Sequence, residues 1–195
     1  MSKLSLPTYN YKIAILGYYS VGKSSLSLKY VRNQFNPNEE STIGASYLTK
    51  SMSTKDSTIQ FEIWDTAGQE RYNSLVSIYY KNADAALIVY DITSRDSFEA
   101  AKQWVYELNF QKPKDFLKIL VGNKTDMEED RQVDFEEGKE YAMQQNLIFL
   151  EASAKSGENV SKIFELFASN LPKDKYKPKK KGVKLGHSFM EYFCC

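Results

Sequence analysis

The feature that most constrains this chain is the string GYYSVGKS at residues 17–24. It fits the pattern G-x-x-x-x-G-K-[ST], with an apolar, strand-like run before it (residues 11–17) and helical spacing after it (residues 23–31). In that context the loop N–H groups and the N-terminus of the helix face phosphate groups. Lys23 then meets the phosphates and the Ser24 hydroxyl can ligate Mg²⁺. The string predicts a phosphate-binding loop, and a plain glycine turn is the weaker alternative.

Strand-like and helical patterns alternate along the rest of the chain. Strand patterns occupy residues 46–54, 58–64, 85–90, 116–122 and 147–150, and helical patterns occupy residues 71–81, 97–109, 135–145 and 160–170. The first two strands, joined at Lys55 and Asp56, predict a hairpin. The alternation predicts an α/β fold, a mostly parallel sheet covered on both faces, whose ligands bind beyond the carboxyl ends of the strands. Gly17, Asp65, Asp91, Asn123 and Ser153 all lie at or just past such ends.

Thr42 and Asp65 are the further candidates for a magnesium site. Mg²⁺ takes octahedral oxygen ligands and keeps several waters, so the protein supplies only one or two. Thr42 belongs to a stretch, residues 36–42, with too little apolar content to be fixed by packing. We expect Thr42 to be the second ligand after Ser24, and Asp65 to orient a metal-bound water.

The string Asn123-Lys124-Thr125-Asp126 predicts the selection of guanine. The Asp126 carboxylate can accept hydrogen bonds from guanine N1–H and the exocyclic amine, a pair of donors that adenine lacks. A site built on such bonds rejects the analogue without them by roughly 10⁴–10⁵-fold. Lys124 can lie along the base, and the Ala154 N–H, within Ser153-Ala154-Lys155, can meet guanine O6.

Charge and cysteine are concentrated in the last residues of the chain. Seven lysines against Asp174 and Glu191 give residues 173–195 a net charge of +5, whereas the other residues carry 19 basic and 23 acidic side chains, a net −4. Pro172 ends the patterned region, and the Lys/Pro-rich stretch beyond it cannot bury enough apolar surface to fold. We therefore expect a domain over residues 1–172 and a disordered basic tail over 173–195. Cys194 and Cys195 are the only cysteines, which suits a reducing compartment.

Taken together, these strings resemble those of a Ras-superfamily small GTPase and, within that superfamily, a Rab. Rab-like strings are DTAGQE at residues 65–70, RYNSL at 71–75, YYKNA at 79–83 and VYDIT at 89–93, and STIGASYL at 41–48 is similar to the early-endosomal Rab subgroup. The resemblance implies a P-loop NTPase G domain, with a six-stranded sheet, one antiparallel edge strand and five helices. It implies a monomer that binds GTP, GDP and Mg²⁺, and no nucleic acid.

The resemblance also implies roles for particular residues. Gln69 would orient the attacking water, the Gly68 amide would contact the γ-phosphate, and Phe35 would cover the base. The other nucleotide contacts would come from Ser20, Val21, Gly22, Lys23, Ser24, Ser25, Thr42, Asn123, Lys124, Asp126, Ser153, Ala154 and Lys155.

Tyr18 and Tyr19 depart from the family pattern, which has small residues there. Tyr19 either crowds the γ-phosphate and an arginine from an activating protein, or points to solvent or a partner. A Rab-like switch that hydrolyses GTP slowly therefore competes with a pseudo-GTPase that only binds nucleotide. An ATP-using kinase with a P-loop lacks support, since Asp126 selects guanine and no arginine-rich lid is evident.

The tail resembles the doubly prenylated end of a Rab. Lipids on Cys194 and Cys195 would give a stable membrane anchor, since one chain binds only marginally. The alternative is a free or oxidised cysteine pair. The resemblance implies effectors, an exchange factor, a GTPase-activating protein, a GDP-dissociation inhibitor and the prenylation machinery as partners. It implies a location on the cytoplasmic face of intracellular, endosomal membranes, with cycling through the cytosol.

Overall fold

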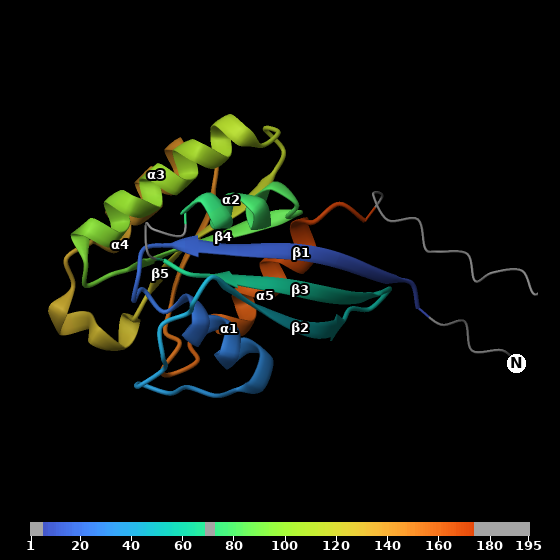
Figure 1. Ribbon diagram of the computed structural model, residues 1–195, viewed down its shortest axis with the longest axis horizontal. Helices are drawn as coiled ribbons and strands as arrows, with labels where there is room; N and C mark the ends of the chain where they lie inside the picture. The colour runs from blue at the N-terminus through green and yellow to red at the C-terminus, as the bar shows by residue number, and fades with distance from the viewer. Residues whose placement is uncertain (1–5, 69–72, 174–195) are drawn as a thin grey trace, which may run out of the picture.

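The computed structural model describes residues 6–68 and 73–173, and within this part a six-stranded sheet forms the centre (Figure 1). The strand order is β2-β3-β1-β4-β5-β6; β2 is antiparallel to β3, and the other neighbours are parallel. The elements are β1 (Thr8–Gly17), α1 (Lys23–Arg32), β2 (Ala45–Ser53), β3 (Thr58–Thr66), α2 (Asn73–Lys81), β4 (Ala85–Asp91), α3 (Arg95–Gln111), β5 (Leu117–Asn123), the 3₁₀ helix η2 (Thr125–Asp130), α4 (Phe135–Gln144), β6 (Ile148–Ala152) and α5 (Val160–Asn170). The expected fold is confirmed, including its antiparallel edge strand.

The alternation of side chains along the strands divides the core into two layers. Ile13 and Ile15 of β1 face a cluster that includes Leu26 of α1 and Phe164 of α5. Their neighbours in β1 belong to the opposite cluster, which helices α2, α3 and α4 cover. Every residue of the central strand β4 is buried, as expected for a parallel strand covered on both faces.

An aromatic group fixes α1 against the sheet and thereby fixes the phosphate-binding loop. The rings of Tyr30 and Phe164 stack with centroids 3.5 Å apart, and Phe61 of β3 meets Phe164 edge-on at 5.7 Å. Aromatic pairs of this kind add to the free energy gained from burying their area. Because α1 begins at Lys23, this packing also places the first turn of the helix beside the ends of β1 and β3.

The observed bounds differ from the expected ones mainly at the ends of elements. Helix α5 has the expected bounds, whereas β1 begins three residues early, at Thr8, because Thr8 to Asn10 pair with β3. Helix α3 begins at Arg95 rather than 97, since Ser94 caps it by accepting a hydrogen bond from the Ser97 N–H. The helix η2 was not expected from the sequence.

The other observed ends differ from the predicted ones by one or two residues. The structure describes α2 only from Asn73 on. Among the described residues, no helix is both long and apolar enough to cross a membrane.

Candidate nucleotide-binding site

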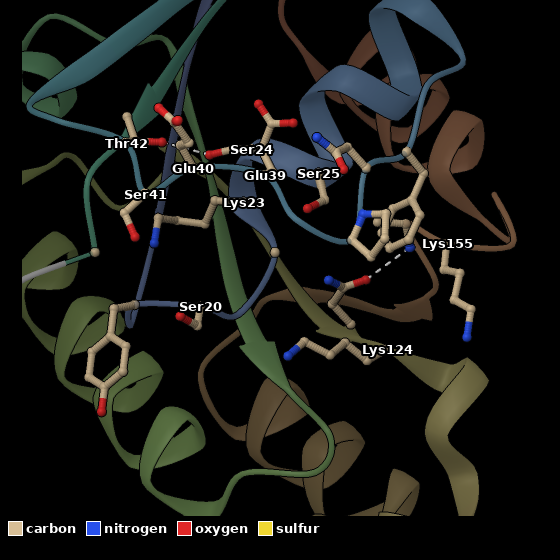
Figure 2. A pocket seen from close by; sticks show the side chains of 18 of the residues that line it. Ser20, Lys23, Ser24, Ser25, Glu39, Glu40, Ser41, Thr42, Lys124 and Lys155 are labelled. Carbon is tan, nitrogen blue, oxygen red and sulfur yellow. Dashed lines mark hydrogen bonds between the residues drawn. The ribbon is translucent and has the colours of Figure 1, made fainter.

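A cavity of about 490 Å³ lies at the carboxyl edge of the sheet (Figure 2). Its lining comes from the loop after β1, the loop before β2, the end of β3, and the segments after β5 and β6. The lining residues are Tyr19, Ser20, Gly22, Lys23, Ser24, Ser25, Phe35, Asn36, Pro37, Glu39, Glu40, Ser41, Thr42, Thr66, Gly68, Asn123, Lys124, Asp126, Met127, Ala154 and Lys155. One cavity thus gathers most of the expected nucleotide contacts, which are far apart in the sequence.

The phosphate-binding loop wraps around the Lys23 ammonium. Lys23 Nζ donates to the carbonyl oxygens of Gly17, at 3.0 Å, and Tyr18, at 2.6 Å. Burial lowers the pKa of Lys23 to about 8, although the nearby Asp65 carboxylate opposes this. Among the residues that the structure describes, neutral carbonyls and one carboxylate compensate this buried cation, which is well placed to meet a phosphate.

Gly22 and Gly68 leave space for the close contacts around the phosphate-binding loop. Gly22 has φ 92°, and a Cβ there would lie 2.3 Å from Asn123 Nδ2. At Gly68 a Cβ would lie 2.4 Å from Lys23 Nζ and 2.4 Å from the Tyr18 carbonyl oxygen. A side chain at either position would displace the groups that shape the phosphate end of the cavity.

The three expected magnesium residues meet in one place. Ser24 Oγ and Thr42 Oγ1 lie 2.8 Å apart, as the dashed line in Figure 2 marks. Thr42 Oγ1 is 3.5 Å from Asp65 Oδ2, and Ser46 Oγ, which was not expected here, donates to that oxygen at 3.3 Å. Burial raises the pKa of the Asp65 carboxyl, against the hydrogen bonds from Ser24, Ser46 and Thr42 and the charge of Lys23.

These residues fit Mg²⁺ by their chemistry. Hydroxyl and carboxylate oxygens are the hard ligands that this ion takes. Oδ1 of the buried Asp65 has no hydrogen-bond partner among the residues that the structure describes. A divalent cation, with its waters, would compensate the charge of the buried carboxylate. Ser24, Thr42 and Asp65 are therefore the residues that would hold it.

Asn123 joins the two ends of the cavity. Its Nδ2 donates to the Val21 carbonyl at 2.8 Å, and its Oδ1 accepts from the Ala154 N–H at 3.1 Å. Val21 is itself buried in the core and does not line the cavity. The Ala154 N–H, expected to be available for guanine O6, is thus already engaged, and O6 would have to share it.

Asp126 lies at the end of the cavity where the base would bind, and each oxygen of its carboxylate has a partner. Ser153 Oγ donates to Asp126 Oδ1 at 2.5 Å, and Lys155 Nζ is 3.4 Å from Oδ2. Ser153 also accepts from the Ser156 N–H, at 3.0 Å, so the hydroxyl cannot turn away easily. Ser153 therefore orients Asp126 instead of lining the cavity itself.

Asp91 was expected at a strand end beside the site but without a role there, and in the structure it fixes Lys124. Lys124 has a left-handed backbone, φ 74°, and its Nζ forms an ion pair with Asp91 Oδ2 at 2.6 Å. Asp91 Oδ1 accepts from both the N–H and the hydroxyl of Thr93, at 2.9 and 2.7 Å. The position of Asp91 at a strand end was the only sequence signal for this role.

Tyr19 lines the cavity with half of its surface exposed (50%), and its ring centroid lies 4.2 Å from that of Tyr18. Each of the two alternatives for Tyr19 thus has one observation in its favour. Met127 and the acidic pair Glu39 and Glu40 also line the cavity, and no sequence pattern predicted them there. Figure 2 shows Glu39 and Glu40 beside Ser24. Gln69, Cys194 and Cys195 lie outside the described residues.

The Ras family model matches residues 12–173, most of the chain and all of the cavity described above. The chain belongs to the Ras family. It is therefore a small GTPase, a switch that binds guanine nucleotides and hydrolyses GTP.

Proposed function

We propose that this small GTPase is a Rab, whose GTP-bound form recruits effectors to endosomal membranes in vesicle traffic. The Rab-like strings at residues 71–75, 79–83 and 89–93 support the family assignment, and residues 41–48 support the endosomal subgroup. The proposal includes a division of the chain into a domain, residues 1–172, and a tail, residues 173–195.

The observation that carries the switch is the attachment of the loop before β2. Residues 36–41 are exposed, and Thr42 meets Ser24 and Asp65 through its hydroxyl. An exposed polar segment gains little from packing, while ordering costs about 1–2 kcal/mol per residue. Contacts of Thr42 with the metal and the γ-phosphate would supply that free energy in the GTP state only.

An aromatic surface beside this loop supports effector binding. The Trp64 ring packs against those of Tyr47 and Tyr79, with centroid distances of 4.9 and 5.0 Å. Ile43, next to Thr42, is 84% exposed, and Ile78 of α2 is also exposed. Aromatic side chains at the centre of a patch are typical of binding hot spots. A partner bound here would contact both the loop before β2 and helix α2.

Hydrolysis in this site depends mainly on positioning and charge. Lys23 would neutralise the β- and γ-phosphates, and Ser24, Thr42 and Asp65 would hold Mg²⁺. The bound ion supplies positive charge at the phosphate oxygens. We assign the orientation of the attacking water to Gln69. Asn123 holds the phosphate-binding loop to the base end, so both halves of the nucleotide meet one rigid frame.

Hydrogen exchange tests the switch directly. Residues 36–42 should be more protected with a non-hydrolysable GTP analogue than with GDP, whereas β4 should be equally protected in both states. Equal protection of residues 36–42 in the two states would refute the switch mechanism.

The anchor is tested by the pair of changes Cys194→Ser and Cys195→Ser. The double variant should move from the membrane fraction to the cytosol, since lysines alone provide an attraction that fades beyond a Debye length of about 8 Å. Retention on endosomal membranes would refute the lipid anchor.

Partners of the wild type, including the exchange factor, the activating protein and the GDP-dissociation inhibitor, should bind according to the nucleotide state.

A further inference from the structure

Arg131 makes the most extensive side-chain ion pair in the described part of the chain, and it lies outside the cavity. Its guanidinium donates to Glu128 through Nε and Nη2, at 2.8 and 2.7 Å, and to Glu151 through Nη1 and Nη2, at 2.7 and 2.8 Å. Nη1 also donates to the Val133 carbonyl at 2.9 Å. Bidentate arginine–carboxylate pairs fix geometry as well as adding energy.

The two carboxylates belong to the two segments that form the base end of the cavity. Glu128 lies in η2, two residues after Asp126, and Glu151 lies in β6, two residues before Ser153. Asp126 and Ser153 are themselves joined by the 2.5 Å hydrogen bond. Arg131 therefore ties together the same two segments whose relative position sets the orientation of the Asp126 carboxylate.

Among the described residues, the other side-chain contacts of η2, from Asp126 to Ser153 and Lys155 and from Thr125 to Glu158, reach the segment after β6 and not the strand itself. The end of the loop is held to β4 by backbone bonds, from the N–H groups of Gln132 and Val133 to the Ile92 carbonyl, at 2.8 and 3.0 Å. Those bonds would survive a change at Arg131. Loss of its side chain should thus loosen η2 against β6 while leaving the loop attached to the sheet.

We propose that Arg131 is a positioning residue for guanine recognition: by clamping Glu128 to Glu151 it holds Asp126 where both of its hydrogen bonds to the base can form. The proposal rests on guanine binding by Asp126. It predicts that Arg131 governs discrimination at the base more than affinity for the phosphates.

Inosine diphosphate is the probe that isolates this effect. Its base retains N1–H and O6 but lacks the exocyclic amine, so only one bond to Asp126 can form. The wild-type protein should prefer GDP over inosine diphosphate, and a displaced Asp126 should reduce that preference. Losing most of one charge-assisted hydrogen bond narrows the affinity ratio by about tenfold.

The choice of variant has to avoid a buried, unpaired carboxylate. Glu151 is only 10% exposed, so Arg131→Met alone would leave the Glu151 carboxylate buried without a partner of opposite charge. The double variant Arg131→Met/Glu151→Gln removes the clamp without that penalty. Glu128→Ala is the second variant, because Glu128 is 65% exposed and its loss removes the side-chain bonds between Arg131 and η2 without disturbing the core.

Arg95→Met is the matched control. Arg95 also pairs with a glutamate, Glu137 of α4, and donates to a main-chain carbonyl, that of Gln132, at 2.8 Å. It joins α3 to α4 and to the loop after η2, and it forms no hydrogen bond or ion pair with the described residues of η2 or β6. Competition binding measures the ratio of the affinity for GDP to the affinity for inosine diphosphate. Relative to the wild type, this ratio should fall about tenfold in the double variant and should also fall in Glu128→Ala. It should be unchanged in Arg95→Met.

Three outcomes distinguish base recognition by Asp126 from the positioning role of Arg131. A wild-type protein without preference for GDP over inosine diphosphate would refute base recognition by Asp126, and the proposal with it. A wild-type preference that Glu128→Ala and the double variant retain in full would overturn the role of Arg131 alone. A fall in affinity for both nucleotides by the same factor would mean that Arg131 is only structural.

Discussion

Asp126→Asn is the substitution that most directly tests the base end of the site. Asp126 Oδ1 already accepts the Ser153 hydroxyl at 2.5 Å, and the side chain is 18% exposed. In the variant we expect the amide oxygen to keep the bond to Ser153, so that the NH₂ group faces the base. The exocyclic amine of guanine would then face a donor, N1–H would face at most a neutral oxygen, and both charge-assisted bonds would be lost.

The size of the effect follows from those two bonds. Hydrogen bonds to a charged group contribute about 1.5–3 kcal/mol each, so their loss costs about 3–6 kcal/mol. At about 1.4 kcal/mol per factor of ten, GDP affinity should fall by about 10²- to 10⁴-fold. Xanthosine diphosphate, which carries an oxygen in place of the amine, should gain affinity because the new NH₂ group can donate to it.

Displacement of a fluorescent nucleotide by GDP and by xanthosine diphosphate measures both changes. The control is Asp130→Asn, an exposed carboxylate in the same 3₁₀ helix that does not line the cavity. Unchanged GDP affinity in Asp126→Asn, or equal losses in the two variants, would show that Asp126 does not recognise the base.

Three further predictions concern the phosphate end and the core. Ser24→Asn should weaken GTP more than GDP in the presence of Mg²⁺, since an amide cannot replace the hydroxyl as a metal ligand without crowding; an unchanged GTP-to-GDP affinity ratio would remove Ser24 from the metal site. Tyr19→Gly should raise the single-turnover hydrolysis rate, because the ring lines the cavity, with Tyr106→Ala on the exposed face of α3 as the control; an equal rate in Tyr19→Gly and wild type would mean that the ring does not obstruct catalysis. Phe164→Ala should lower the free energy of unfolding by about 3–5 kcal/mol in denaturant titrations of the GDP-bound protein, as the buried ring stacks on Tyr30; a loss below about 1 kcal/mol would contradict the packing argument.

Local patterns were sufficient where burial is regular along the chain. Helix α5 has the predicted bounds, Val160–Asn170, because Val160, Ile163, Phe164 and Phe167 repeat at helical spacing and all four are buried. The fully buried strand β4 was also recognised from its apolar run, with one residue missing at its end. In both elements the side chains that carry the signal are the ones that pack.

Local patterns failed where pairing or charge, rather than burial, decides the structure. The start of β1 is mostly solvent-exposed, and only its hydrogen bonds to β3 make it a strand. Helix η2 has no buried residue and an acidic sequence, so it offers no apolar periodicity.

The sequence by itself determined which residues could meet a guanine nucleotide, since the phosphate loop, Thr42, Asp65 and Asp126 are recognisable by type and order. Tertiary structure alone decided how they are held. Ser153 bonds to Asp126 over 27 residues, and Asn123 reaches Val21 over 102. Such bonds depend on the parallel strand order, which brings the ends of β1, β5 and β6 to one edge of the sheet. The partner of a side chain across that edge cannot be inferred from hydrophobic periodicity, because a hydrogen bond joins two individual residues and needs no repeating pattern in the sequence.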